Sequence, residues 1–329
     1  MKQEAINELE KAVYAGDFFC RDEFKIRQKY RETAKLIHPD ICSEPGAKEA
    51  FEKLNLLYEA ALKDIQNGSW AESNVLHLLG LSPIQYRNKI KTEIGERYVT
   101  DDQVIWTFDD DKLKYRQLFL DSIYLFDWKR LATNLSKVFS KRVPVINRVM
   151  DQSILLMKNP NDYPLDLFLQ AYGEQLDGRD IAWMISRMCD LACFLKMMDI
   201  VHNGLEPKNL FINPTDHSIS ILGGWQYAVK RGHKMTGVSH EIFDLMTTQA
   251  RTSKIATSET DIESIRRMFQ RIVCNKDDIP TPMMDWIMKG SSDDALHEFV
   301  LWDEALKKAY GVRKFKRFSA EADKIYSQN

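Results

Sequence analysis

The sequence predicts an α+β fold that is mostly helical and divided into two units. Three observations predict it. Apolar residues recur at helical spacing through most of the first 65 residues, a mixed pattern with strand-like segments occupies about 95–158, and helical spacing dominates from residue 165 onward. A chain of 329 residues is long enough for a large domain and a small module, each with its own core.

The first unit, residues 1–66, is expected to be an antiparallel helical hairpin preceded by a further helix. The expected helices span residues 4–15, 21–37 and 47–65. One side of the second helix is apolar, with Phe24, Tyr30, Ala34 and Ile37. A similar apolar face runs along the third helix, so the two helices can pack together and hold the loop between them at the tip of the hairpin.

A linker is expected at residues 67–80, because the apolar period lapses there and the Asn and Gly in Gln66-Asn67-Gly68-Ser69 favour a helix stop. The second unit is expected over 81–318, followed by a tail at 319–329. Its expected strands are Gln103–Phe108, Leu118–Phe126, Ile154–Met157, Leu210–Ile212 and Ile219–Leu222. Its expected helices include residues 128–140, 181–198 and a segment that opens at Ser258.

The composition is that of a globular protein, with 44% hydrophobic residues, 29% charged residues and a net charge of -2. Because there is no global basic excess, we expect no nucleic-acid partner. The sequence contains no signal-peptide core and no apolar run of about 18 residues, so we expect no membrane association and a cytoplasmic location.

The cysteines are scattered along the chain and never spaced CxxC. This pattern favours reduced core thiols over disulfides or a zinc site. We expect no bound metal and no cofactor.

A basic stripe is expected on the second helix. Arg27, Arg31 and Lys35 recur at intervals of four residues, which places them on one face of a helix that runs toward His38. Such a stripe can steer association with an acidic partner surface, although a basic helix face is commonly just solvated.

The segments KYRETAKLIHPD and AFEKLNLLYEAALKD resemble the second helix, the HPD tripeptide and the third helix of the J-domain family, over roughly residues 5–65. The resemblance implies that Arg27, Arg31 and Lys35 dock on a heat-shock ATPase chaperone. It also implies that the loop His38-Pro39-Asp40 triggers ATP hydrolysis by that partner. The first helix departs from the family pattern, and the chain has neither a Gly/Phe-rich linker nor a CxxCxGxG region.

Residues 200–225, IVHNGLEPKNLFINPTDHSISILGGW, resemble the catalytic loop and metal loop of protein kinases, HRDxxPxN followed by DFG. His202 and Asn209 match the kinase pattern, whereas Gly204 stands for the catalytic aspartate and Gly223 for the metal-binding aspartate. Phosphoryl transfer needs both carboxylates, so the resemblance implies a degraded kinase loop. It also implies that Asp261 braces the backbone of that loop.

The implied second domain is bilobal and protein-kinase-like, with a small lobe at about 95–160 and a helical lobe at about 161–318. Upstream of the loop there is neither a glycine-rich phosphate loop nor a convincing VAIK lysine. An alternative is that 181–225 is only a helix, a loop and a strand pair whose turn residues echo a kinase.

We therefore expect a J-domain co-chaperone that recruits and stimulates a heat-shock ATPase chaperone. Its catalytically dead kinase-like domain would bind an unknown client protein or partner, and the chain would not be an enzyme. One alternative is an atypical kinase or nucleotide-binding regulator localised by its J-domain, with Glu206 or Asp216 replacing the lost carboxylates. Another is a structural interaction protein whose HPD loop is vestigial.

Overall fold

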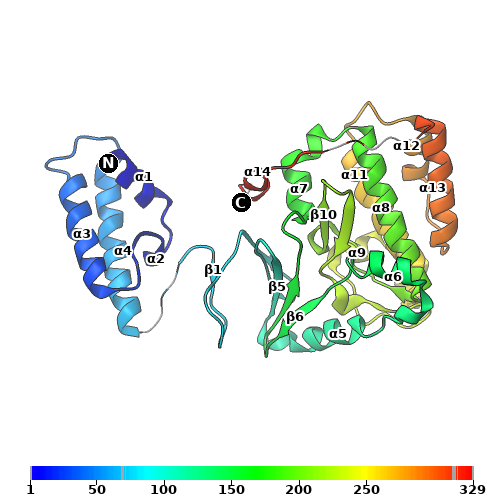
Figure 1. Ribbon diagram of the computed structural model, residues 1–329, viewed down its shortest axis with the longest axis horizontal. Helices are drawn as coiled ribbons and strands as arrows, with labels where there is room; N and C mark the ends of the chain where they lie inside the picture. Colours follow the sequence, from blue (N-terminus) through cyan, green and yellow to red (C-terminus); the bar gives the residue numbers. More distant parts are fainter. Residues whose placement is uncertain (1, 68–69, 71, 313–315, 317, 328–329) are drawn as a thin grey trace. The chain divides into compact units, whose positions relative to one another are not determined.

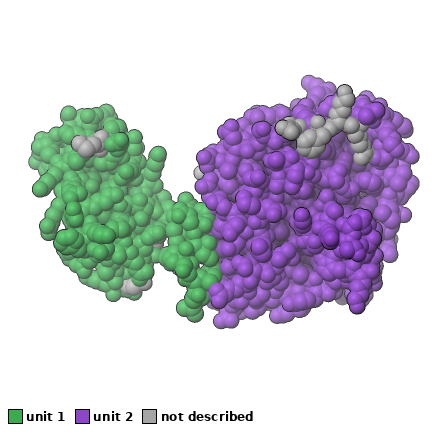
Figure 2. All heavy atoms as spheres, in the orientation of Figure 1, with its two compact units in different colours: residues 1–86 green, residues 87–329 purple. Residues whose placement is uncertain are grey.

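The chain divides into two compact units, residues 1–86 and 87–329 (Figure 2). The computed structural model describes residues 2–67, 70, 72–312, 316 and 318–327. It confirms an α+β fold that is mostly helical. Gly68 and Ser69 of the expected helix stop lie outside the described residues, and the helix before them ends at Asn67.

Helices dominate the first unit (Figure 1). They are α1 Lys2–Lys11, α2 Ala15–Phe18, α3 Glu23–Ile37 and α4 Ala47–Asn67. The expected helix at 4–15 is confirmed as far as Lys11, where α1 ends, and the helix is interrupted before α2 begins at Ala15. There the Asp17 carboxylate accepts hydrogen bonds from the backbone N–H groups of Val13 and Tyr14, both at 2.8 Å, so a side chain replaces the helical carbonyl partners.

The hairpin of α3 and α4 is the core of this unit. Tyr30, Ala34 and Ile37 of the expected packing face contact that core, whereas Phe24 does not. Ile26, Thr33 and Ile37 are the buried residues of α3, whereas Phe24 is 77% exposed. Phe24 lies two positions before Ile26, which turns it about 200° around the helix and away from α4.

Part of the segment assigned to a linker has regular structure. Strand β1 Val75–Leu76 pairs with β2 Ile84–Gln85 in antiparallel register. Trp70 packs into the helical core, and the Ser73 hydroxyl donates to Asp17 at 2.5 Å. These contacts tie the chain after α4 to the first unit.

The second unit begins with a five-stranded antiparallel sheet in the order β3-β4-β5-β7-β6. The strands are β3 Asn88–Thr92, β4 Gly95–Val99, β5 Gln103–Phe108, β6 Ile146–Val149 and β7 Ser153–Met157. The expected strands at 103–108 and 154–157 are therefore confirmed. Strand β3 lies upstream of 95–160, so the sheet begins before the expected start of the small lobe.

A helical segment crosses from β5 to β6. It contains η1 Asp110–Lys112, α5 Leu113–Ile123, η2 Trp128–Arg130 and α6 Thr133–Phe139. The expected strand at Leu118–Phe126 is wrong. Tyr115, Phe119 and Ile123 recur every four residues on the packed face of α5, a helical period that the continuous run Leu118-Phe119-Leu120 obscures.

The rest of the unit is a helical lobe built around α8 Gly178–Met197, with α13 Ala295–Tyr310 beside it (Figure 1). Its other helices are α7 Leu165–Tyr172, α9 His240–Leu245, α10 Thr248–Ser253, α11 Ser258–Val273 and α12 Thr281–Met288. Its 3-10 turns are η3 Gly173–Gln175, η4 Pro207–Asn209 and η5 Trp225–Tyr227. Its strands are β8 Tyr163–Pro164, β9 Ile200–Val201, β10 Leu210–Asn213, β11 Ser218–Ile221 and β12 Val229–Lys230. One hydrophobic core continues from the sheet into this lobe.

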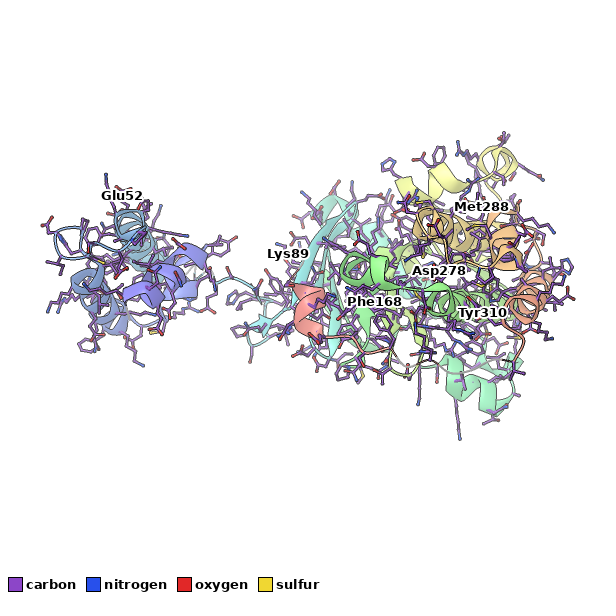
Figure 3. All side chains as sticks on the ribbon, turned by 90° about the horizontal axis from the view of Figure 1, so that it is seen from above. Glu52, Lys89, Phe168, Asp278, Met288 and Tyr310 are labelled. Atoms are coloured by element: carbon purple, nitrogen blue, oxygen red, sulfur yellow. The ribbon has the colours of Figure 1, made fainter. Side chains whose placement is uncertain are left out.

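Residues assigned to a tail contribute a helix, α14 Ala322–Tyr326, which packs on α7 beside the labelled Phe168 (Figure 3). The Ile325 side chain of α14 is fully buried. Asp323 forms an ion pair with Arg87 at 2.8 Å, and the Glu321 N–H donates to the Tyr172 hydroxyl at 2.9 Å. This segment is therefore part of the second unit.

Within the described ranges, no helix combines the length and hydropathy that crossing a bilayer requires. The same part of the chain contains no group of three or more His, Cys, Asp or Glu side chains placed to hold a metal ion.

Replacing Ile325 with alanine tests the docking of α14. Because the side chain is fully buried, Ile325→Ala should lower the free energy of unfolding of the second unit by about 2–4 kcal/mol in urea titrations. Val312 is 81% exposed, so Val312→Ala should change it by less than about 0.5 kcal/mol. Equal stability of Ile325→Ala and the wild type would mean that α14 does not pack as described.

Candidate functional site

The loop His38-Pro39-Asp40 caps α3 and is tied down by local hydrogen bonds. The His38 carbonyl accepts from the backbone N–H groups of Ile41 and Cys42, both at 2.9 Å. The Asp40 N–H donates to His38 Nδ1 at 3.2 Å, and the His38 ring meets the Phe51 ring edge-on at 5.0 Å. Pro39 and Asp40 are exposed, so the loop has a fixed backbone and an accessible surface.

The basic stripe lies on the exposed side of α3, but its members are not equivalent. Arg27 forms an ion pair with Glu23 at 2.7 Å and donates to the Tyr58 hydroxyl at 3.4 Å. Arg31 and Lys35 are exposed and form no ion pair with any other described residue. The unpaired positive charge of the stripe is therefore concentrated near the HPD loop.

Two contacts of Tyr30 hold α3 against α4. The ring of Tyr30 stacks on that of Tyr58 at 4.1 Å, and the Tyr30 hydroxyl donates to Asn55 Oδ1 at 2.8 Å. These contacts set the alignment of the two helices and thus the position of the loop that joins them.

In the second unit, Asp261 fixes the loop that follows α8 and β9. Its carboxylate accepts from the backbone N–H groups of His202 at 2.8 Å and Asn203 at 2.9 Å. This is the bracing role that the kinase resemblance implies. Burial raises the pKa of Asp261 to about 7, while the two N–H donors oppose that shift. Burial lowers the pKa of His202 to about 3, so its ring is neutral beside Trp225.

Asn209 and Glu206 close the loop on itself. Asn209 Nδ2 donates to the Gly204 carbonyl at 2.9 Å and to Glu206 Oε1 at 3.0 Å. Glu206 also accepts from the Ser239 hydroxyl at 3.1 Å and pairs with Lys208 at 3.1 Å. Burial raises the pKa of Glu206 to about 7, while the contact with Lys208 opposes that shift.

Trp106 on β5 fills the space in front of Gly223. Its indole N–H donates to the Leu222 carbonyl at 2.8 Å, and the ring is 1% exposed. A Cβ added at Gly223 would overlap the Trp106 ring and approach Asn209 Oδ1 to 2.6 Å. No side chain can therefore stand at residue 223 unless Trp106 or Asn209 moves.

The turn between β3 and β4 lies at the edge of the cleft formed by Trp106, Gly223 and Asn209. Glu93 in this turn accepts from the Tyr227 hydroxyl and from the His240 N–H, both at 3.2 Å. The cavity left between this turn, Trp106 and Asn209 is about 10 Å³. That is room for about one water molecule, whereas small-ligand sites measure about 300–1,000 Å³.

The structure thus brings His202, Gly204, Asn209 and Gly223 together in one buried loop cluster. The residues of the HPD region gather separately in the first unit. Sequence reasoning missed Trp106 and Glu93, whose roles depend on contacts with residues more than 100 positions away. The adjacent pair Gly223-Gly224 was the available signal, since paired glycines admit a close neighbour.

No protein-family model matches the chain. Among curated proteins, the chaperone protein DnaJ of Trichormus variabilis is 47% identical over 38 residues, 12% of this chain. The match spans 10% of the DnaJ sequence. Among solved structures, the crystal structure of the BubR1 kinase domain superposes with a TM-score of 0.48 and 12% identity, covering 77% of this chain and 86% of that one. The chain thus has a short segment that is similar in sequence to DnaJ.

The fit between Trp106 and Gly223 is testable by stability. Gly223→Ala should lower the free energy of unfolding by about 1–3 kcal/mol, because the new methyl group overlaps the indole ring. The double variant Gly223→Ala with Trp106→Ala should cost less than the sum of the single changes by about 1 kcal/mol. Urea unfolding of the four proteins measures this coupling.

Gly290→Ala is the matched control, because no heavy atom lies within 4 Å of its added Cβ. It should be neutral to within about 0.5 kcal/mol. A Gly223→Ala variant as stable as this control would show that the cleft is open in solution.

Proposed function

We propose that this chain is a J-domain co-chaperone that stimulates a heat-shock ATPase chaperone through His38-Pro39-Asp40. The observation that carries the proposal is the exposed HPD loop, held at the tip of the α3 and α4 hairpin beside the unpaired charges of Arg31 and Lys35. The similarity to DnaJ supports the same class of partner.

In this proposal the stripe guides encounter and the loop acts after docking. Exposed positive charges raise the rate of association with an acidic groove, and salt weakens this effect because it screens the charges. Pro39 restricts the backbone of the loop, and the Asp40 carboxylate can accept hydrogen bonds from a partner arginine or amide. Because His38 and Phe51 are already in contact, little ordering of the loop is needed on binding.

We further propose that the second unit binds a client or partner and transfers no phosphoryl group. Glycine at residues 204 and 223 supplies neither the carboxylate that orients a nucleophile nor the one that holds magnesium. The filled space around Trp106 and the small cleft volume support this assignment over a nucleotide-binding regulator.

The decisive measurement is single-turnover ATP hydrolysis by a heat-shock ATPase chaperone in the presence of the full chain. His38→Gln should abolish the stimulation without lowering the thermal stability of the first unit by more than a few degrees. Stimulation by both proteins alike, or by neither with any plausible partner, would contradict the co-chaperone proposal.

Charge reversal at Arg31 tests whether the basic stripe docks on the partner. Arg31→Glu should raise the concentration needed for half-maximal stimulation by about 5–10-fold at low salt, and less at 0.5 M salt. Lys63→Glu is the matched control, because Lys63 is an exposed lysine of α4 outside the stripe. If Lys63→Glu weakens stimulation equally, only the net charge matters and the stripe is not a docking surface.

Nucleotide binding is tested by thermal unfolding of the full chain with 5 mM Mg-ATP. A ligand that binds only the folded state stabilises it by RT ln(1 + [L]/Kd) and so raises its Tm. Because we expect the second unit not to bind ATP, we expect no change in its Tm. A saturable, magnesium-dependent rise would favour the nucleotide-binding alternative.

A further inference from the structure

A second, larger cavity of the helical unit lies apart from the closed cleft. It measures about 790 Å³, within the range of small-molecule sites. One wall comes from the end of α6 and the residues after it, Lys137 to Arg142. The other walls are the turn between β10 and β11, Arg187 of α8 and Asn159 after β7.

The charge of this cavity is positive. Its basic side chains are Lys137, Lys141, Arg142 and Arg187, and its carboxylates are Asp162 and Asp216. Asp162 accepts from the side-chain amides of Asn159 at 2.9 Å and Asn213 at 3.0 Å, and burial raises its pKa. Asp216 accepts from the Ser218 N–H at 3.1 Å and its hydroxyl at 2.6 Å. Neither carboxylate forms an ion pair with a basic side chain in the part of the chain that the structure describes.

One further carboxylate, that of Asp190, lies near two of the guanidinium groups. Asp190 lies 2.6 Å from Arg187 Nη1 but 3.9 Å from Arg142 Nη1, too far for a hydrogen bond. Asp190 therefore pairs closely with Arg187, whereas Nη1 of Arg142 is left without a hydrogen bond to it.

The backbone of Arg142 is held in place, and one of its buried guanidinium donors lacks an acceptor. Its N–H donates to the Phe139 carbonyl at 2.9 Å, and its carbonyl accepts from the Ile221 N–H at 2.8 Å. The guanidinium carbon lies 5.3 Å from the centre of the Phe139 ring, and 11% of the side chain is exposed. Its Nη1 atom has no hydrogen-bond partner among the described residues. A buried donor of this kind is costly unless an anion accepts from it.

Hydroxyl and amide groups complete the lining. Ser140, Ser218, Ser220 and Asn159 contribute them, and the buried Ser220 Oγ atom likewise has no partner among the described residues. Phe, Tyr and Trp are absent from the described lining, and the His217 ring is stacked on Trp183 at 4.2 Å. The cavity therefore offers charge and hydrogen bonds but little aromatic surface for a nucleobase.

We propose that this cavity binds a phosphorylated polyol, such as a sugar bisphosphate. Arg142 would take a phosphate with the help of Lys137 and Lys141, and Ser220 and Asn159 would bind hydroxyl groups. The inference does not depend on the activity of the HPD loop.

Isothermal titration of the full chain with fructose 1,6-bisphosphate in 0.15 M NaCl tests the proposal. We expect saturable binding at one site per chain. Arg142→Met keeps most of the side-chain length but removes the charge, and should weaken binding at least 10-fold. Arg148→Met removes an exposed arginine of β6 outside the cavity and should change the affinity less than twofold.

A second variant guards against misfolding of Arg142→Met. Lys137 and Lys141 are exposed, so Lys137→Met with Lys141→Met should fold normally and weaken binding about 5–10-fold. Inorganic phosphate should bind at least 100-fold more weakly than the bisphosphate. The proposal is overturned if the wild type does not bind, if Arg148→Met weakens binding as much as Arg142→Met, or if ADP or phosphate alone binds as tightly.

Discussion

Two backbone N–H groups of the loop after α8 point at a single carboxylate, that of Asp261 on α11. His202 and Asn203 are fully buried, so without this acceptor both donors would lose their hydrogen bonds to water and gain nothing in return. Asn203 also has a φ of 58°, a conformation that needs support from its surroundings. The positions of Glu206 and Asn209 follow from this anchored backbone. The hydrogen bonds to Asp261 therefore fix the conformation of the loop whether or not the loop takes part in any reaction.

The cleft beside that loop is filled rather than vacant. A glycine at residue 223 removes the atoms that would compete with the Trp106 ring, and the indole N–H satisfies the Leu222 carbonyl in the same place. A large side chain thus occupies the volume that a small residue leaves, which preserves the packing density of the interior. Glu93 then ties the turn between β3 and β4 to Tyr227 and His240, which keeps the sheet close to the helical lobe. These contacts leave little free volume beside the loop.

Local signals in the sequence located the elements whose contacts are local or strictly periodic. The hairpin of α3 and α4, the HPD loop, β5, β7 and α8 all appear within a few residues of their expected bounds. Features that depend on distant partners escaped prediction. Three features are of this kind: the helix break at Asp17, the exposure of Phe24 and the helical state of Leu118–Ile123. Each depends on which packing arrangement is more stable, and a short stretch of sequence does not determine that. The partnership of Trp106 with Gly223 spans more than 100 residues, so its pattern is not visible along the chain.

The docking of α14 has a consequence for the order of events during synthesis. Asp323 meets Arg87 across a sequence separation of 236 residues, so the second unit cannot complete its fold until α14 has been made. At bacterial or eukaryotic ribosome speeds of about 5–20 residues per second, that interval is about 10–50 s. The first unit has its own core and finishes early. During translation the nascent chain thus passes through a stage at which the first unit, with the HPD loop, is folded while the second unit is not.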